Sequence, residues 1–173
     1  MISVSDNDQK IIEFLIRSYA SRFTIREIGT KLKISSAGAY KSLKKLEQAD
    51  ITKSEKLGTG LFYEINYSHP AALYLACFVL AQQAKDVGEL KLHCRAVFKS
   101  GESLTIVTNQ HDAELVKSIA SKQFKEAKIS MLSEDEFNNG IQAKDKHIVA
   151  LMEEAGVIHG AEFIIRAIAR RQR

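Results

Sequence analysis

The segment after Ser35, a residue that like Ser36 can cap a helix, carries side chains whose types and spacing suit contact with a polyanion. Ala39, Leu43 and Leu46 recur four and three residues apart, which places them on one apolar stripe of a helix. If that stripe faces a core, the opposite side presents hydroxyl, phenol and ammonium groups, and a helix of this width fits the major groove of B-DNA. The residues expected on the outward side are Ser36, Ala37, Tyr40, Lys41, Lys44 and Lys45.

These outward residues divide by the contacts that their chemistry allows. Lysine ammonium groups are expected to touch mainly phosphates, which gives an affinity that falls with salt. On an arbitrary helix, lysines on a solvent face are more often plain solvated charges, so the neighbouring elements have to decide between the two interpretations. Base choice would come from the residues near the helix start, which are Ser36, Ala37, Tyr40 and Lys41.

Two helices are expected before this segment. The first ends near Ser21 and has Asp6 or Asp8 placed to cap its start. Thr24 and Glu27 form a Ser/Thr-x-x-Glu capping box, which predicts that a second, short helix begins there. The apolar stripe of the first helix consists of Ile11, Ile12, Phe14, Leu15 and Tyr19.

A β-hairpin is expected after the third helix. Ile51 to Lys56 and Leu61 to Asn66 have strand character, and glycine supplies the positive φ that a tight turn at residues 58–60 needs. Cationic and hydroxyl groups on this hairpin are placed to reach the adjacent minor groove or the backbone of DNA, whereas Glu55 weakens the local positive field. The hairpin residues that we assign to DNA contact are Lys53, Lys56 and Thr59.

The order of helix, capped helix, serine-started helix and glycine-turn hairpin resembles a winged helix-turn-helix domain of bacterial and archaeal transcription regulators. The resemblance covers residues 7–68 and rests on the run TIREIGTKLKISSAGAYKSLKKLEQADITKSEKLGTGLFYEIN. It implies that residues 1–68 form a domain that binds double-stranded DNA. The same fold also serves as a protein or RNA interaction module, so a protein-protein adaptor is an alternative.

The charge of this domain favours a homodimer. Residues 1–68 hold eleven Lys and Arg against eight Asp and Glu, so the excess of about three positive charges is low for a strong DNA binder. A dimer would double the phosphate contacts. Residues 69–87 offer a means of pairing, because Pro70 suits the first turn of a helix from about Ala71 to Asp86 whose nearly all-round apolar character requires burial. The same segment could instead act as a linker helix that packs on its own chain.

Residues 88–173 alternate between strand and helix patterns. Together with the N-terminal helices and hairpin, this alternation predicts an α+β protein whose second domain is a small α/β unit. Strands are expected near 90–98, 104–108 and 128–132, helices at 112–124, 144–154 and 161–171, helical turns after Ser133, and a short extended connector at 156–160.

The C-terminal pattern resembles a nucleotidyltransferase-type domain of the small archaeal class that is often joined to a winged helix. The similarity lies in CRAVFKSGESLTIVTN, ISMLSEDEF and GVIHGAEFIIRAI. Active members of that family hold divalent metals with two aspartates, but Gly101 and Ser103 occupy those positions here, and neither supplies the carboxylate oxygens that magnesium requires. We therefore expect a non-catalytic assembly or sensing domain without metal or cofactor. The enzymatic alternative is a nucleotidyltransferase that uses Glu102 and another acid, such as Asp112, as unconventional metal ligands.

Other chemistry has little support in the sequence. The two cysteines lack the spacing of a zinc site or a disulfide framework, and the five histidines are dispersed. The longest uncharged run, residues 71–84, falls short of the roughly 18–20 apolar residues that a membrane span needs. The N-terminus carries acids and no apolar signal core. A soluble, cytoplasmic protein is expected, and the sequence does not identify a small-molecule effector.

Overall fold

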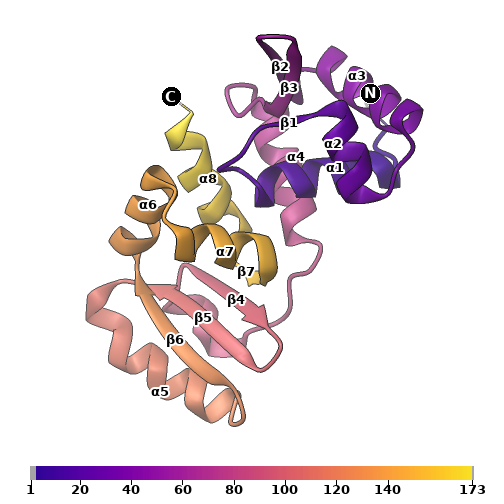
Figure 1. Cartoon of the computed structure of the whole chain (residues 1–173). Helices are drawn as coiled ribbons and strands as arrows, with labels where there is room; N and C mark the ends of the chain where they lie inside the picture. The colour runs from indigo at the N-terminus through magenta and orange to yellow at the C-terminus, as the bar shows by residue number, and fades with distance from the viewer. Residues whose placement is uncertain (1–2, 173) are drawn as a thin grey trace. The chain divides into compact units, whose positions relative to one another are not determined.

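The computed structural model describes residues 3–172 and shows an α+β protein with two sheets. The chain divides between Val79 and Leu80 into two compact units (Figure 1). This boundary lies inside the segment that we expected to join the two domains. Residues 1, 2 and 173 of the predicted domains lie outside the described part of the chain.

Three helices and a small sheet make up the N-terminal unit. A capping box at Thr24 and Glu27 opens the second helix, and Ser35 caps the third, as the sequence predicted. The first helix is capped by Ser5 and not by Asp6 or Asp8, because Asp8 occupies the third helical position and reaches back to the Ser5 backbone N–H. The helices are α1 (Asp6–Arg17), α2 (Ile25–Leu32) and α3 (Ser36–Gln48). The first helix therefore ends four residues before the predicted Ser21.

The hairpin forms an antiparallel sheet in the order β1-β3-β2. The predicted hairpin is present, and Gly58 adopts a φ of 59° in its turn. The short strand β1 was not predicted, since two residues carry no readable alternation. Its place is set by pairing with Tyr63 and Phe62 across the sheet. The strands are β1 (Phe23–Thr24), β2 (Thr52–Leu57) and β3 (Gly60–Ile65).

Helix α4 (Pro70–Ala81) follows the sheet and begins at proline as expected. It ends at Ala81, five residues before the predicted Asp86. Gly88 has a φ of 57° and opens a 3-10 helix, η1 (Gly88–Leu92). The prediction of a strand from Leu90 was therefore wrong: Leu90 is buried in η1, where its apolar side chain meets the core as well as a strand residue would.

The C-terminal unit contains a mixed sheet in the order β6-β5-β4-β7, with helices on both faces. Strand β4 runs antiparallel to β5 and β7, whereas β5 and β6 are parallel and are joined through α5. The predicted extended connector is a strand, β7, that pairs with β4. The elements are β4 (Ala96–Ser100), β5 (Ser103–Thr108), η2 (Gln110–Asp112), α5 (Ala113–Gln123), β6 (Lys128–Ser133), α6 (Glu134–Ala143), α7 (Lys146–Glu154), β7 (Gly156–His159) and α8 (Ala161–Arg171).

Neighbouring residues of β4 show how both faces of this sheet are buried. Val97 packs with residues of α5 and η1, and the next side chain, Phe98, lies 5.8 Å from the ring of Phe137 on α6. Successive side chains of a strand point to opposite faces, so β4 carries core residues on both. Among the described residues, none of the helices combines the length and apolar content needed to cross a bilayer.

Candidate nucleic-acid interface

Helix α3 has one buried and one exposed face. Ala39, Leu43 and Leu46 are completely buried, as their spacing predicted. Tyr40, between them in sequence, is 55% exposed. The other exposed residues of this face are Ser36, Ala37, Lys41 and Lys44. The structure thus brings five of the predicted contact residues together on one uncovered surface, which we call the α3 face.

The turn between α2 and α3 fixes the angle at which this face is presented. The Ile34 N–H donates to the Gly29 carbonyl over 2.9 Å, and a Cβ on Gly29 would lie 3.1 Å from the Ile34 carbonyl oxygen. Glycine therefore allows the close crossing of the two helices. Gly38 has a similar internal role, because an added Cβ would meet Ile34 and Ser35 at 3.1 Å. The space that Gly38 leaves is used by its own chain.

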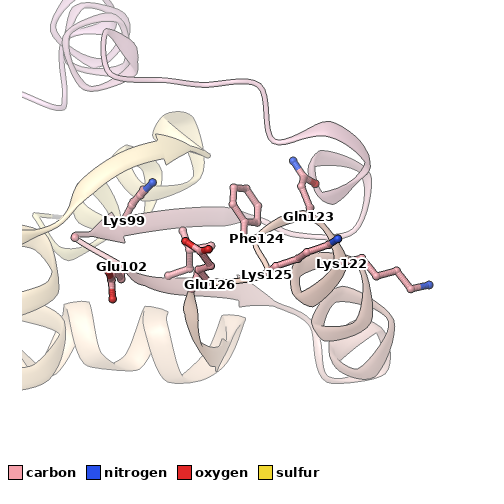
Figure 2. Close-up of a pocket in the computed structure, with 10 residues that line it drawn as sticks. Lys99, Glu102, Lys122, Gln123, Phe124, Lys125 and Glu126 are labelled. Carbon is pink, nitrogen blue, oxygen red and sulfur yellow. The ribbon is translucent and has the colours of Figure 1, made fainter.

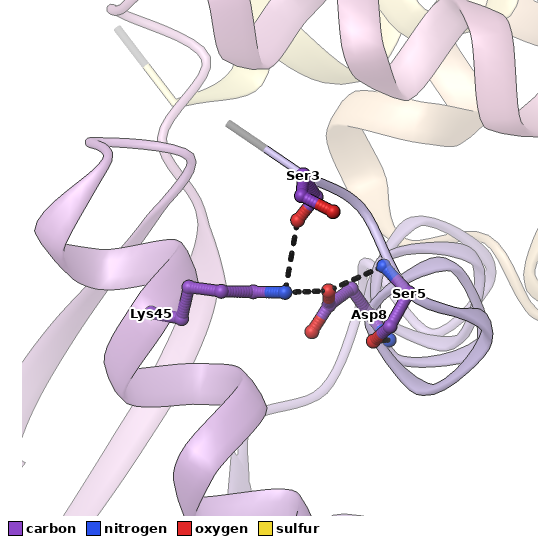
Figure 3. Close-up of polar contacts among 4 residues, drawn as sticks. All are labelled: Ser3, Ser5, Asp8 and Lys45. Atoms are coloured by element: carbon purple, nitrogen blue, oxygen red, sulfur yellow. Dashed lines mark hydrogen bonds and ion pairs between the residues drawn. The ribbon is translucent and has the colours of Figure 1, made fainter. Parts of the chain in front are cut away.

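Lys45 differs from the other lysines of α3, because it turns toward the body of the unit. Its ammonium group forms an ion pair with Asp8 and donates a 2.9 Å hydrogen bond to the Ser3 carbonyl (Figure 3). Its assignment to a solvent face is thus corrected: an acid 37 positions earlier in the chain, which helical spacing cannot reveal, holds it. We leave Lys45 out of the α3 face.

Asp8 is the buried partner of this ion pair. Burial alone would raise the pKa of its carboxyl group, but hydrogen bonds from Lys45, Ser5 and Ser42 outweigh that effect and hold the pKa below its usual value. Asp8 is completely buried, whereas 40% of the Lys45 side chain is exposed. The pair therefore ties the first turn of α1 to the last turn of α3.

Lys41 and Lys44 keep their ammonium groups at the surface. Lys44 lies 3.4 Å from Glu47, at a spacing of three residues, and both side chains reach solvent. Such an exposed pair is weak and can exchange its partner for a phosphate. Lys41 has no ion-pair partner among residues 3–172.

The hairpin carries fewer available charges than the sequence indicated. Lys53 is paired with Glu64 on the neighbouring strand at 3.0 Å. Glu55 is neutralised in part by Arg22, 2.5 Å away, a pairing that no local pattern foretold. Lys56 and Thr59 are exposed near the turn.

Two exposed cations next to α3 are not among the DNA-contact residues that we predicted from the sequence. Arg26 is exposed in the first turn of α2, and Lys33 is exposed at the left-handed residue that ends this helix, with a φ of 55°. Both lie in the segments that border α3 in sequence. Both residues fall outside the apolar stripe of α2, and this pattern could have predicted from the sequence that they are exposed.

No protein-family model, curated protein or solved structure matches the chain.

The turn from Ser100 to Ser103 is a tight connection between β4 and β5. The resemblance implies that active family members carry their metal-binding aspartates here, where this chain has Gly101 and Ser103. Ser100 and Ser103 pair directly, and Gly101 has a φ of 56°. A cavity of about 390 Å³ lies beside this turn, and Figure 2 shows Phe124 among its lining side chains and Lys122 extending away from them. Its lysines, Lys99, Lys122 and Lys125, are exposed.

Glu102 and Asp112, the example pair of the enzymatic alternative, lie apart. Glu102 precedes β5 and Asp112 follows it, so the full length of a six-residue strand separates them, roughly 20 Å at 3.3 Å per residue. Asp112 also accepts a 2.6 Å hydrogen bond from Asn109. One ion cannot bind both carboxylates. Within residues 3–172, no group of three or more His, Cys, Asp and Glu side chains is arranged to hold a metal.

Proposed function

We propose that the protein is a transcription regulator whose residues 1–68 form a winged helix-turn-helix domain that binds double-stranded DNA. One observation carries the proposal. Helix α3 is anchored by a fully buried stripe, yet its opposite face leaves a tyrosine, two lysines and a serine uncovered.

The chemistry of this face suits the major groove. Lys41 and Lys44 supply the phosphate contacts, while Ser36 and Tyr40 offer hydroxyl groups to base edges. Lys56 and Thr59, near the hairpin turn, extend the contact to the adjacent backbone or minor groove. Because regulation of transcription requires access to the chromosome, we place the protein in the cytoplasm.

Helix α4 supports a proposed homodimer. Tyr74 is 68% exposed and Phe78, one turn further, is 60% exposed on a helix without a charged residue. Two such faces pair symmetrically in a twofold dimer. The dimer would present two α3 faces to one duplex and so double the phosphate contacts.

We propose that residues 88–173 form a nucleotidyltransferase-like domain. Its proposed role is subunit assembly or the sensing of a signal, without catalysis. The tight turn at Gly101 supports this assignment, since it leaves neither an aspartate pair nor a loop that could hold a substrate phosphate and its metal. The proposed domain requires no cofactor.

A selection of genomic DNA fragments tests the proposed function. Bound fragments should share a sequence, and their affinity should fall as salt rises, because phosphate contacts release counterions. Absence of both sequence preference and salt dependence would contradict DNA binding. Recovery of a protein partner through the α3 face in DNA-free conditions would favour the adaptor alternative instead.

A further inference from the structure

A cavity of about 500 Å³ in the C-terminal unit gathers three arginines. Arg95 precedes β4, and Arg166 and Arg170 lie one turn apart on the same face of α8. Asn138, on α6, and His159, at the end of β7, add two hydrogen-bonding groups. His159 is uncharged at neutral pH, because burial, with a smaller effect of Lys91, lowers its pKa. We call this the arginine cavity.

The sheet topology places the arginine cavity at an edge where strand ends converge. Strands β5, β6 and β7 point in one direction, and β4 points the opposite way. Their registers align Thr108 with Ser133, Ala96 with Val107 and Val97 with His159, so three carboxyl ends and the amino end of β4 meet at one edge. In open α/β sheets, ligands bind outside the carboxyl ends of strands.

Two glutamates pair with two of the arginines. The Arg95 Nε donates to Glu134 at the start of α6 over 2.7 Å, and Arg166 is held by Glu162 at 2.7 Å. A guanidinium group has five donors, and the bond from Nε to Glu134 leaves the two terminal nitrogens of Arg95 able to bind another acceptor. Both ion pairs are exposed and therefore weak, so a ligand anion can replace a glutamate as the partner of either arginine.

The charge of the arginine cavity is positive. Three guanidinium groups stand against the two carboxylates of Glu134 and Glu162, and Arg170 is exposed without an ion-pair partner among residues 3–172. A planar guanidinium group can bind two oxygens of one carboxylate or phosphate at the same time. The lysines that line the cavity beside Gly101 cannot bind an anion in this way.

We propose that the arginine cavity binds a small organic dianion, such as a phosphate monoester or a dicarboxylate, through Arg95, Arg166 and Arg170. The volume exceeds that of an inorganic ion, and the half-buried Phe163, which packs 5.5 Å from Phe137, provides an apolar wall for the carbon part of the ligand. The inference does not depend on DNA binding, because every residue it uses belongs to the C-terminal unit.

Calorimetric titration of the full chain tests the proposal with two probes, glycerol 3-phosphate and succinate, at fixed ionic strength. We expect saturable binding of at least one dianion at millimolar concentration, and none of glycerol. Binding of only one probe would identify the preferred anionic group. Loss of a charge-assisted contact in Arg170→Gln should weaken binding by about 10-fold or more.

Lys117→Gln is the matched control, since it removes one exposed positive charge from α5 outside the arginine cavity. It should leave the affinity within about 2-fold of the original value. Arg170 is exposed, so the variant should fold, and its circular dichroism checks this. The proposal fails if neither dianion binds, if glycerol binds equally well, or if Arg170→Gln and Lys117→Gln weaken binding alike.

Discussion

At the scale of single residues, the lysines of α3 separate into two kinds that share one side-chain chemistry. Lys41 is exposed without an ion pair among the described residues, whereas Lys45 closes a contact with a buried acid. The first is available to a phosphate and the second stabilises the unit. Substitution of each should therefore affect a different measurement.

Lys41→Ala should weaken DNA binding and leave stability unchanged. Loss of one phosphate contact per α3 face lowers the slope of log affinity against log salt by about one for each contact. Fluorescence anisotropy across a salt series measures this slope. Lys117→Ala, on α5, removes the same charge from a helix outside the α3 face, and an equal loss of slope there would show that only net charge matters.

Lys45→Ala should destabilise the N-terminal unit by about 1–2 kcal/mol near neutral pH, because it leaves the Asp8 carboxylate buried without its cation. Lys44→Ala, which removes the exposed pair with Glu47, should cost no more than about 0.5 kcal/mol. Urea unfolding followed by circular dichroism compares the two variants. Equal losses of unfolding free energy in the two variants would show that the buried Asp8 pair stabilises the fold no more than the exposed Glu47 pair does.

The same pair predicts a dependence on pH. The folded pKa of Asp8 lies below its usual value of 3.8, so the ionised carboxylate stabilises the fold above that pH and the contribution disappears as pH falls through the folded pKa. The difference in stability between the original chain and Lys45→Ala should therefore be greatest above pH 5 and shrink in acid. A difference that stays constant down to pH 3 would argue against an ionic contact.

At the scale of elements, the joint between β7 and α8 depends on one glycine. Gly160 has a φ of 87°, and an added Cβ would lie 2.1 Å from the Arg95 carbonyl oxygen and 2.6 Å from the Ala96 Cα. Both contacts are to backbone, which cannot move without breaking the pairing of β4. The start of α8 is thus held against the sheet edge.

Gly160→Ala should consequently lower the free energy of unfolding by at least about 3 kcal/mol, through backbone strain and overlap together. Gly101→Ala is the control, because Gly101 has a φ of 56° but nothing lies within 4 Å of an added Cβ. It should cost only about 1–2 kcal/mol of left-handed strain. Thermal unfolding measures both losses of stability. Similar losses in the two variants would show that the overlap of an added Cβ with the Arg95 and Ala96 backbone contributes little.

At the scale of the whole molecule, the proposed dimer decides how strongly a domain of low charge can bind DNA. Tyr74→Lys combined with Phe78→Lys should convert a dimer into a monomer in sedimentation velocity, because it places charges in an apolar contact. The salt slope of DNA binding should fall by about half at the same time.

Leu92→Lys provides the control for this test. Leu92 is 72% exposed in η1, so its substitution places a lysine, one of the two charges that the double variant adds, at another exposed apolar position. The control should remain dimeric. A single 19.3 kDa species for the unsubstituted chain at every concentration would end the dimer proposal.

The sequence alone determined the elements whose signals lie within a few residues. Thr24 and Glu27 start α2, the stripe of Ala39, Leu43 and Leu46 sets the buried face of α3, and glycine at position 58 permits the hairpin turn. Capping, periodicity and positive φ are local physical effects, so a short window of residues contains them.

Only the tertiary structure decided where distant segments meet. It paired Lys45 with Asp8, converted residues 156–159 into a strand beside β4, and brought Arg95 to the cavity that faces α8. The partners in these contacts lie about 40 to more than 60 positions apart in sequence. Their positions depend on the packing of the whole unit, which no local pattern of residues encodes.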